Sequence, residues 1–207
     1  MIDAFMNHRH LLAIPVLLAT LGVHAQDRTA DPLAPLAQCI NRSQFQFRTQ
    51  DRLPAGATRR IVKMAAGDRQ ISTADGYRLM LFRKSSLPFV NLKIERSAEG
   101  QFAADRDTIV AQMREMAARG KLPQQLPLET DTRDGVEVLG LNNASIAQAQ
   151  GIISLYTLLH AASGTVATAY ILNQPADPSD FATDAQYQAL RTQLIASLAS
   201  CMADPAQ

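Results

Sequence analysis

The chain is poor in the residues on which many recognition and catalytic sites are built. It has no tryptophan, and aromatic residues make up only 5% of its 207 positions. This scarcity disfavours sites that stack sugar rings on aromatic side chains. No glycine-rich phosphate-binding loop occurs, and we interpret the glycines as turn residues. We therefore expect no bound cofactor.

Histidine is also scarce, which restricts the chemistry further. Of the four histidines, only His160 lies beyond the first 25 residues. A serine- or cysteine-based triad would have to use it, and the Gly-x-Ser-x-Gly elbow is missing. A zinc site needs several His or Cys ligands, which the chain does not supply. Because His160 closes an apolar run, we expect a strand-end histidine bonded to backbone, not a catalytic residue.

The carboxylates define no clear site. Arg133 stands at a position where a calcium-binding loop needs an oxygen ligand, so we expect a solvated turn and no metal. Glycoside hydrolysis needs two carboxylates that converge in space. No particular pair is indicated, and a small hydrolase using carboxylates stays open. The carboxylates around this one predicted hairpin turn are Glu129, Asp131, Asp134 and Glu137.

The N-terminus carries the features of an export signal. Arg9 precedes an apolar run over Leu11–Gly22, and small or aliphatic residues stand before a cut ahead of Gln26. This order is typical of a secretory signal peptide, and the run is shorter than the roughly 20 residues that cross a bilayer. We expect residues 1–25 to be removed. The mature protein should be periplasmic, exported and soluble, with no stable membrane insertion.

The length of the remaining chain predicts one domain. We divide it into an N-terminal segment over 26–58 with a short helix and a single α+β domain over 59–203. Its two cysteines, Cys39 and Cys201, lie near its ends, and an even count in an oxidising compartment predicts one disulfide. A redox-active pair is the alternative, but the Cys-x-x-Cys spacing is missing.

Alternating apolar residues predict strands along most of the domain. The clearest is Phe89–Arg96, where apolar and polar residues alternate strictly. Asp134-Gly135 between two such runs is a strong hairpin signal, and Gly151–His160 with Thr165–Asn173 should form the central hairpin. The expected strands are 59–66, 70–73, 77–83, 89–96, 127–132, 136–141, 151–160 and 165–173, with a turn at 74–76.

One helix is expected between two groups of strands. Asp105 offers an N-cap and Gly120 a stop, so the helix should run from Asp105 to Arg119. Its apolar stripe contains methionine, which suits both core packing and a pliable binding surface, and we interpret it as core. The stripe is Ile109, Val110, Met113, Met116 and Ala117.

Two further helices are expected near the cysteines. A short one over Pro35–Ile40 carries Cys39, and a last one begins at Ser179 or Thr183 and reaches Cys201. The last helix has an apolar stripe that includes its cysteine, which should therefore point inward. That stripe is Tyr187, Leu190, Leu194, Leu198 and Cys201.

Four strands, a helix, four strands and a helix predict an α+β fold. We expect a largely antiparallel β-sheet with a crossover helix and a C-terminal helix packed on it. This element order over Arg59–Cys201 resembles the arrangement of Mog1/PsbP-like small periplasmic proteins. The resemblance implies a non-catalytic binding or accessory role and carries over no site residue.

The net charge of +1 conceals an uneven distribution. Arg42–Arg96 contains twelve Lys or Arg and four Asp or Glu, whereas Ser97–Gln207 contains six and twelve. The halves either neutralise each other or leave a basic face for an acidic partner. Nucleic acid is not expected, since no binding motif supports it. The candidate partner-binding residues are Arg78, Arg83, Lys84, Lys93 and Arg96.

These features lead us to expect a non-enzymatic protein that binds another protein. Its most concrete form is an immunity protein that neutralises a toxin delivered into the periplasm. The alternatives are an accessory or chaperone-like subunit of an envelope complex, and the carboxylate hydrolase. A small-ligand binder also stays open, because two apolar strands beside a methionine-lined helix would enclose a cavity.

Overall fold

The computed structural model describes residues 31–43, 45, 47–53, 58–82, 89–119, 126–143, 145–146, 151–173 and 183–206. Asp31–Gln207 forms one compact unit. The expected signal peptide, and the candidate residues Arg83 and Lys84, lie outside the described residues. None of the described helices is long and apolar enough to cross a bilayer.

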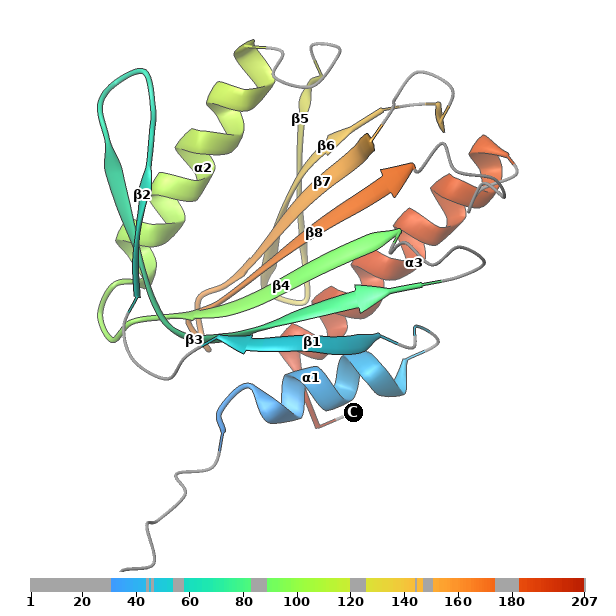
Figure 1. The fold of residues 1–207 in the computed structure, drawn as a ribbon, viewed down its shortest axis with the longest axis horizontal. Coiled ribbons are helices and arrows are strands. Elements are labelled where there is room, and N and C mark those ends of the chain that lie inside the picture. The colour runs from blue at the N-terminus through green and yellow to red at the C-terminus, as the bar shows by residue number, and fades with distance from the viewer. Residues whose placement is uncertain are drawn as a thin grey trace, which may run out of the picture. The chain divides into compact units, whose positions relative to one another are not determined.

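The described strands form one eight-stranded antiparallel sheet (Figure 1). The order along it is β1-β3-β4-β8-β7-β6-β5, and β2 pairs with β3 outside this path. The expected α+β class with a largely antiparallel sheet is confirmed. The strands are β1 (Arg48–Leu53), β2 (Thr58–Val62), β3 (Arg69–Leu81), β4 (Val90–Ser97), β5 (Leu128–Arg133), β6 (Val136–Asn142), β7 (Gly151–His160) and β8 (Thr165–Asn173).

Three described helices cover the two faces of the sheet. They are α1 (Ala34–Arg42), α2 (Phe102–Arg119) and α3 (Asp184–Ala203). Figure 1 shows α1 and α3 on one side of the sheet and α2 on the other. Their apolar side chains belong to two separate buried clusters, one with α1 and α3 and one with α2. Both faces of the sheet are therefore packed.

The centre of the sheet is the β7–β8 hairpin, as its long apolar runs predicted. β8 pairs with β7 on one side and with β4 on the other. At the far edge, Asp134 and Gly135 have φ angles of 51° and 79°, as a tight two-residue hairpin turn between β5 and β6 requires. The hairpins that the sequence predicted in this half are confirmed.

The expectation of two strands separated by a turn at 74–76 is wrong, because this segment forms the single strand β3. It runs without a break from Arg69 to Leu81, with a bulge between Thr73 and Asp75 in its pairing with β4. Asp75 accepts two hydrogen bonds from Arg96, at 3.2 and 2.9 Å. This cross-strand ion pair holds an Asp-Gly sequence, which favours turns locally, in an extended strand.

Helix α2 begins at Phe102, before the predicted start, and Asp105 is not its N-cap. The Asp105 side chain is buried, and its Oδ1 accepts a hydrogen bond from the backbone N–H of Ser72 at 3.0 Å. A tertiary contact with β3 thus takes the carboxylate that was expected to cap the helix. The stripe is core, as expected: Ile109, Val110 and Met113 are buried.

The other two helices agree with the sequence pattern. Thr183 is the N-cap of α3, and its side chain accepts a hydrogen bond from the backbone N–H of Gln186 at 3.2 Å. All five residues of the predicted apolar stripe of α3 are buried. Its cysteine therefore faces the sheet, in position to meet the cysteine of α1.

We predict that Gly76→Ala destabilises the protein by roughly 2 kcal/mol, because it overpacks a strand contact. A Cβ at Gly76 would lie 2.5 Å from the backbone oxygen of Ile94, which the sheet holds in place. Gly140→Ala is the matched control, since the nearest atom there belongs to the ring of Tyr156, at 2.7 Å. Urea unfolding should show the smaller loss for Gly140→Ala, and equal losses would contradict this account.

The predicted disulfide is present between Cys39 and Cys201. It joins the buried faces of α1 and α3 across a sequence separation of 162 residues. In the chain-entropy account, cross-linking such a long loop removes conformational freedom from the unfolded chain, an effect of about 5 kcal/mol. The link ties the first described helix to the last.

We predict that Cys39→Ser/Cys201→Ser folds but unfolds more readily, by up to about 5 kcal/mol, because its unfolded chain gains entropy. Thermal unfolding of the variant and of the wild type, each with and without reductant, measures the loss. Reduction should lower the melting temperature of the wild type alone. A free thiol in native protein before reduction would refute the link.

Candidate functional site

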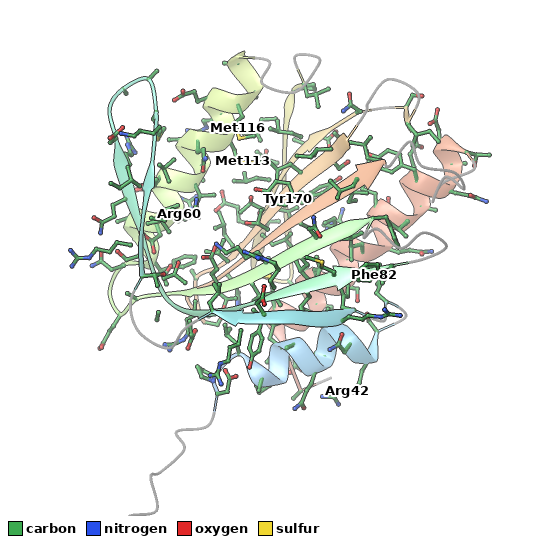
Figure 2. The ribbon with its side chains drawn as sticks, viewed as in Figure 1. Arg42, Arg60, Phe82, Met113, Met116 and Tyr170 are labelled. Carbon is green, nitrogen blue, oxygen red and sulfur yellow. A yellow bond between two sulfur atoms is a disulfide. The ribbon has the colours of Figure 1, made fainter. Side chains whose placement is uncertain are left out.

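A cavity of about 160 Å³ lies between α2 and the middle of the sheet, and we call it the α2 cavity. It exists because α2 makes its main contacts with β3 on one side and with β5 and β6 on the other. Figure 2 shows Arg60, Met113, Met116 and Tyr170 around this space. The lining residues are Arg60, Lys93, Glu95, Ile109, Gln112, Met113, Met116, Leu155, Thr157, Thr168 and Tyr170.

Three charged side chains meet in the α2 cavity. The carboxylate of Glu95, only 9% exposed, lies 2.6 Å from the ammonium of Lys93 and 4.0 Å from the guanidinium of Arg60. The hydroxyl of Thr73 donates a third contact to it, at 3.0 Å. Glu95 and Lys93 share one face of β4 because they are two residues apart. The ion pair is therefore built into the floor of the cavity.

Apolar side chains form the opposite wall of the α2 cavity. Ile109, Met113 and Met116 come from α2, and Leu155 comes from β7. Thr157 lies under the helix, with its hydroxyl 4.0 Å from the sulfur of Met113. Methionine side chains adjust their shape easily, so this wall is adaptable.

Three polar side chains of the α2 cavity make no hydrogen bond to any described residue. They are Gln112 on α2, and Thr168 and Tyr170 on β8. Each carries at least one donor, and Lys93 retains two N–H donors beyond the one directed at Glu95. The cavity therefore holds several donors that a ligand can use.

The structure brings together only part of the predicted partner-binding set. Arg78 and Lys93 lie directly opposite each other on β3 and β4, so they share one face of the sheet. Arg96 is three residues beyond Lys93 and faces the other side. Arg78 pairs with Asp51 at 3.3 Å, and its side chain is 47% exposed.

Arg96 makes a two-hydrogen-bond ion pair with Asp75 within the sheet, so its guanidinium is already occupied. Its hydrogen bonds to Asp75 favour the charged guanidinium and raise the pKa of Arg96. Lys93 is likewise paired, with Glu95. The carboxylates within this half are thus paired with its own cations, and most of its excess positive charge is not neutralised by the other half in the described ion pairs. That Arg78, Lys93 and Arg96 bind a partner stays a prediction.

A second surface stands out on the hairpin of β2 with the first half of β3, which we call the β2–β3 arm. Ile61 is 63% exposed, the only large hydrophobic side chain so exposed among the described residues. Arg59 and Arg69 are exposed, and no described carboxylate pairs with either. On the opposite face of the arm, Val62 packs in the α2 cluster and Arg60 lines the α2 cavity.

We expected His160 to bond to backbone, but in the structure its ring bonds to a side chain. Its Nδ1 lies 2.9 Å from the hydroxyl of Ser163, which itself donates to the hydroxyl of Thr165 at 2.9 Å. Which atom donates between His160 and Ser163 depends on the imidazole tautomer. That His160 is not catalytic stays a prediction.

Two of the four carboxylates around the β5–β6 turn, Asp131 and Glu137, pair with arginines, and Glu129 accepts a hydrogen bond from the side chain of Asn142. Arg133 donates to Asp131 at 2.7 Å, and this hydrogen bond lowers the pKa of Asp131. Arg106 donates to Glu137 at 2.7 and 3.0 Å, and that contact raises the pKa of Arg106. In the described part of the chain, no group of three or more His, Cys, Asp or Glu side chains is placed to hold a metal ion.

Tyr156 is a buried tyrosine whose phenol pKa is raised by the fold. It is 7% exposed and packs over Gly140 on the neighbouring strand. Burial raises the pKa of its phenol to about 12, above the ordinary 10.0, because the phenolate would lose its hydration. Tyr156 therefore keeps its phenolic proton to a higher pH than an exposed tyrosine does.

We predict that Tyr156 makes the fold sensitive to strong alkali. Its raised pKa leaves stability intact below about 10, where both states are protonated, and removes stability as pH rises toward about 12. Tyr156→Phe should therefore lose less stability over that interval, by roughly 2 kcal/mol. Urea unfolding of both proteins across this range measures the difference, and parallel curves would contradict the prediction.

The sequence revealed only part of the α2 cavity. Its methionines and Lys93 were singled out, whereas Arg60, Glu95 and the β8 donors were not. One signal was available: β4 carries a strictly polar face, and the helix that follows it must pack on one face of the sheet. A polar strand face beneath a helix implies a polar cavity or buried ion pairs.

Comparisons with protein-family models, with curated proteins and with solved structures found no match for this chain.

Proposed function

We propose that this is an exported, non-enzymatic protein whose function is to bind another protein through the β2–β3 arm. The observation that carries the proposal is the exposure of Ile61 on a strand that also presents Arg59. Exposed large apolar residues beside cations are typical of protein interfaces, where an apolar anchor is surrounded by polar contacts.

The pairing of β2 supports the same role. Among the described strands β2 pairs with β3 alone, so its other edge has backbone groups that a partner strand can pair with. Charged residues on an edge strand also discourage indiscriminate pairing. We infer a partner whose docking surface is acidic and has an apolar depression for Ile61.

An immunity protein that neutralises a periplasm-targeted toxin is the specific form we propose. Such a protein needs a complementary surface and no catalytic groups. The Mog1/PsbP-like element order and the expected signal peptide both favour an exported binding protein. In a competition assay, deletion of the gene should sensitise cells to attack by sister cells. Unchanged survival, with a stable envelope complex, would favour the accessory-subunit alternative.

We predict that Ile61→Asp weakens partner binding by at least roughly tenfold, since it places a charge where an apolar anchor was buried. Arg59→Glu should slow association and reduce the dependence of the association rate on salt. Exposed charges act mainly on the rate at which the two proteins meet by diffusion. Binding kinetics with the partner captured from the periplasm, at low and high salt, measure both effects.

Arg114→Glu is the matched control for this experiment. Arg114 is also exposed, but it lies on α2 rather than on the β2–β3 arm. This control should bind at the wild-type rate, and all variants should melt close to the wild type. If Ile61→Asp and Arg59→Glu bind as Arg114→Glu does, the arm is not the docking surface.

A further inference from the structure

We propose that the α2 cavity binds a small organic monocarboxylate that carries an apolar chain. This goes beyond the protein-binding role, because it uses the opposite face of the β2–β3 arm. The volume sets the size of the ligand: a cavity of about 150 Å³ accommodates a benzene ring, and this one is about 160 Å³. A ligand of one ring or a short chain fits.

The charges of the α2 cavity select an anion. Its two cations, Lys93 and Arg60, face one described carboxylate, Glu95, which leaves one positive charge unbalanced. A monoanion makes the cavity neutral, whereas an amine adds a second excess charge. Glu95 is only 9% exposed, so solvent screens its pairing with Lys93 poorly, whereas the excess charge of Arg60 lies at the exposed side of the cavity.

The unused donors point to the same ligand. The remaining N–H groups of Lys93, the hydroxyls of Thr168 and Tyr170, and the amide of Gln112 surround one space. A carboxylate accepts several hydrogen bonds at once, and bonds from an ammonium or guanidinium to it are the stronger kind. Arg60, 47% exposed, lies where the cavity meets solvent.

The apolar wall accounts for the rest of the ligand. Ile109, Met113, Met116 and Leu155 present hydrocarbon and thioether groups opposite the charged floor. An apolar chain directed at this wall is removed from water, at about 25 cal/mol per Å² of buried surface. The adaptable methionines allow chains of somewhat different shape.

A role in stability alone explains the ion pair poorly. Replacing a buried ion pair with apolar residues is often neutral or stabilising. Here Thr157 and Thr168, paired across β7 and β8, also leave space that larger side chains would fill. A largely buried Glu95–Lys93 pair beside unfilled space suits a ligand site better than a core.

Hexanoate is a suitable probe, and hexanol is its uncharged counterpart. In protein with isotope-labelled methionine methyl groups, hexanoate should shift the NMR signals of Met113 and Met116 saturably. Met202, in the cluster of α1 and α3, should not respond. Hexanol should bind at least roughly tenfold more weakly, the loss expected of one charge-assisted hydrogen bond.

Two neighbouring arginines provide a matched pair of variants. Arg60→Gln should weaken hexanoate binding several-fold, because Arg60 lines the cavity. Arg59→Gln should leave it unchanged, because adjacent strand residues face opposite sides. Both arginines are exposed, so neither change threatens the fold, and equal melting temperatures verify this.

The proposal is overturned if hexanoate produces no saturable shift, if hexanol binds as tightly, or if the two arginine variants have equal effects. Tighter binding of leucine than of hexanoate would also overturn it and assign a zwitterion to the cavity. Loss of partner binding in Ile61→Asp with hexanoate binding intact would show that the two sites are separate.

Discussion

The antiparallel pairing of β4 with β8 is the contact on which the rest of the structure depends. It joins the strands that precede α2 to those that follow it, so neither half of the sheet closes without the other. Along this seam, Leu92 and Ile94 lie opposite Ala169 and Ala167. These small alanines share one buried cluster with the apolar stripe of α3.

The other face of the same seam has a different character. Lys93 lies opposite Thr168, and both line the α2 cavity. Because successive residues of a strand point to opposite faces, β4 and β8 contribute both to an apolar core and to a polar cavity. The core secures the sheet with the help of the disulfide, and this leaves the α2 face free to retain charged groups and unfilled space.

The cations of the basic half have two different environments in the folded protein. Several cations of the basic half are paired with nearby carboxylates, as Arg96 is with Asp75. Others, such as Arg59 on the β2–β3 arm, have no described ionic partner. The face of β2 that carries Arg59 supports the proposed protein contact, whereas the face that carries Arg60 lines the proposed ligand cavity. One short strand thus serves two surfaces.

The sequence by itself determined the α+β class, the β5–β6 and β7–β8 hairpins, the stripe of α3 and the disulfide, because these depend on local periodicity, turn chemistry and cysteine count. Tertiary structure decided what Asp75 and Asp105 do. Their local preferences for a turn and a helix cap were overridden by Arg96 and by the backbone of Ser72. It also decided the α2 cavity, whose residues come from β2, β4, α2, β7 and β8. No local pattern shows which polar residues of distant elements meet, since only the pairing of the strands brings them together.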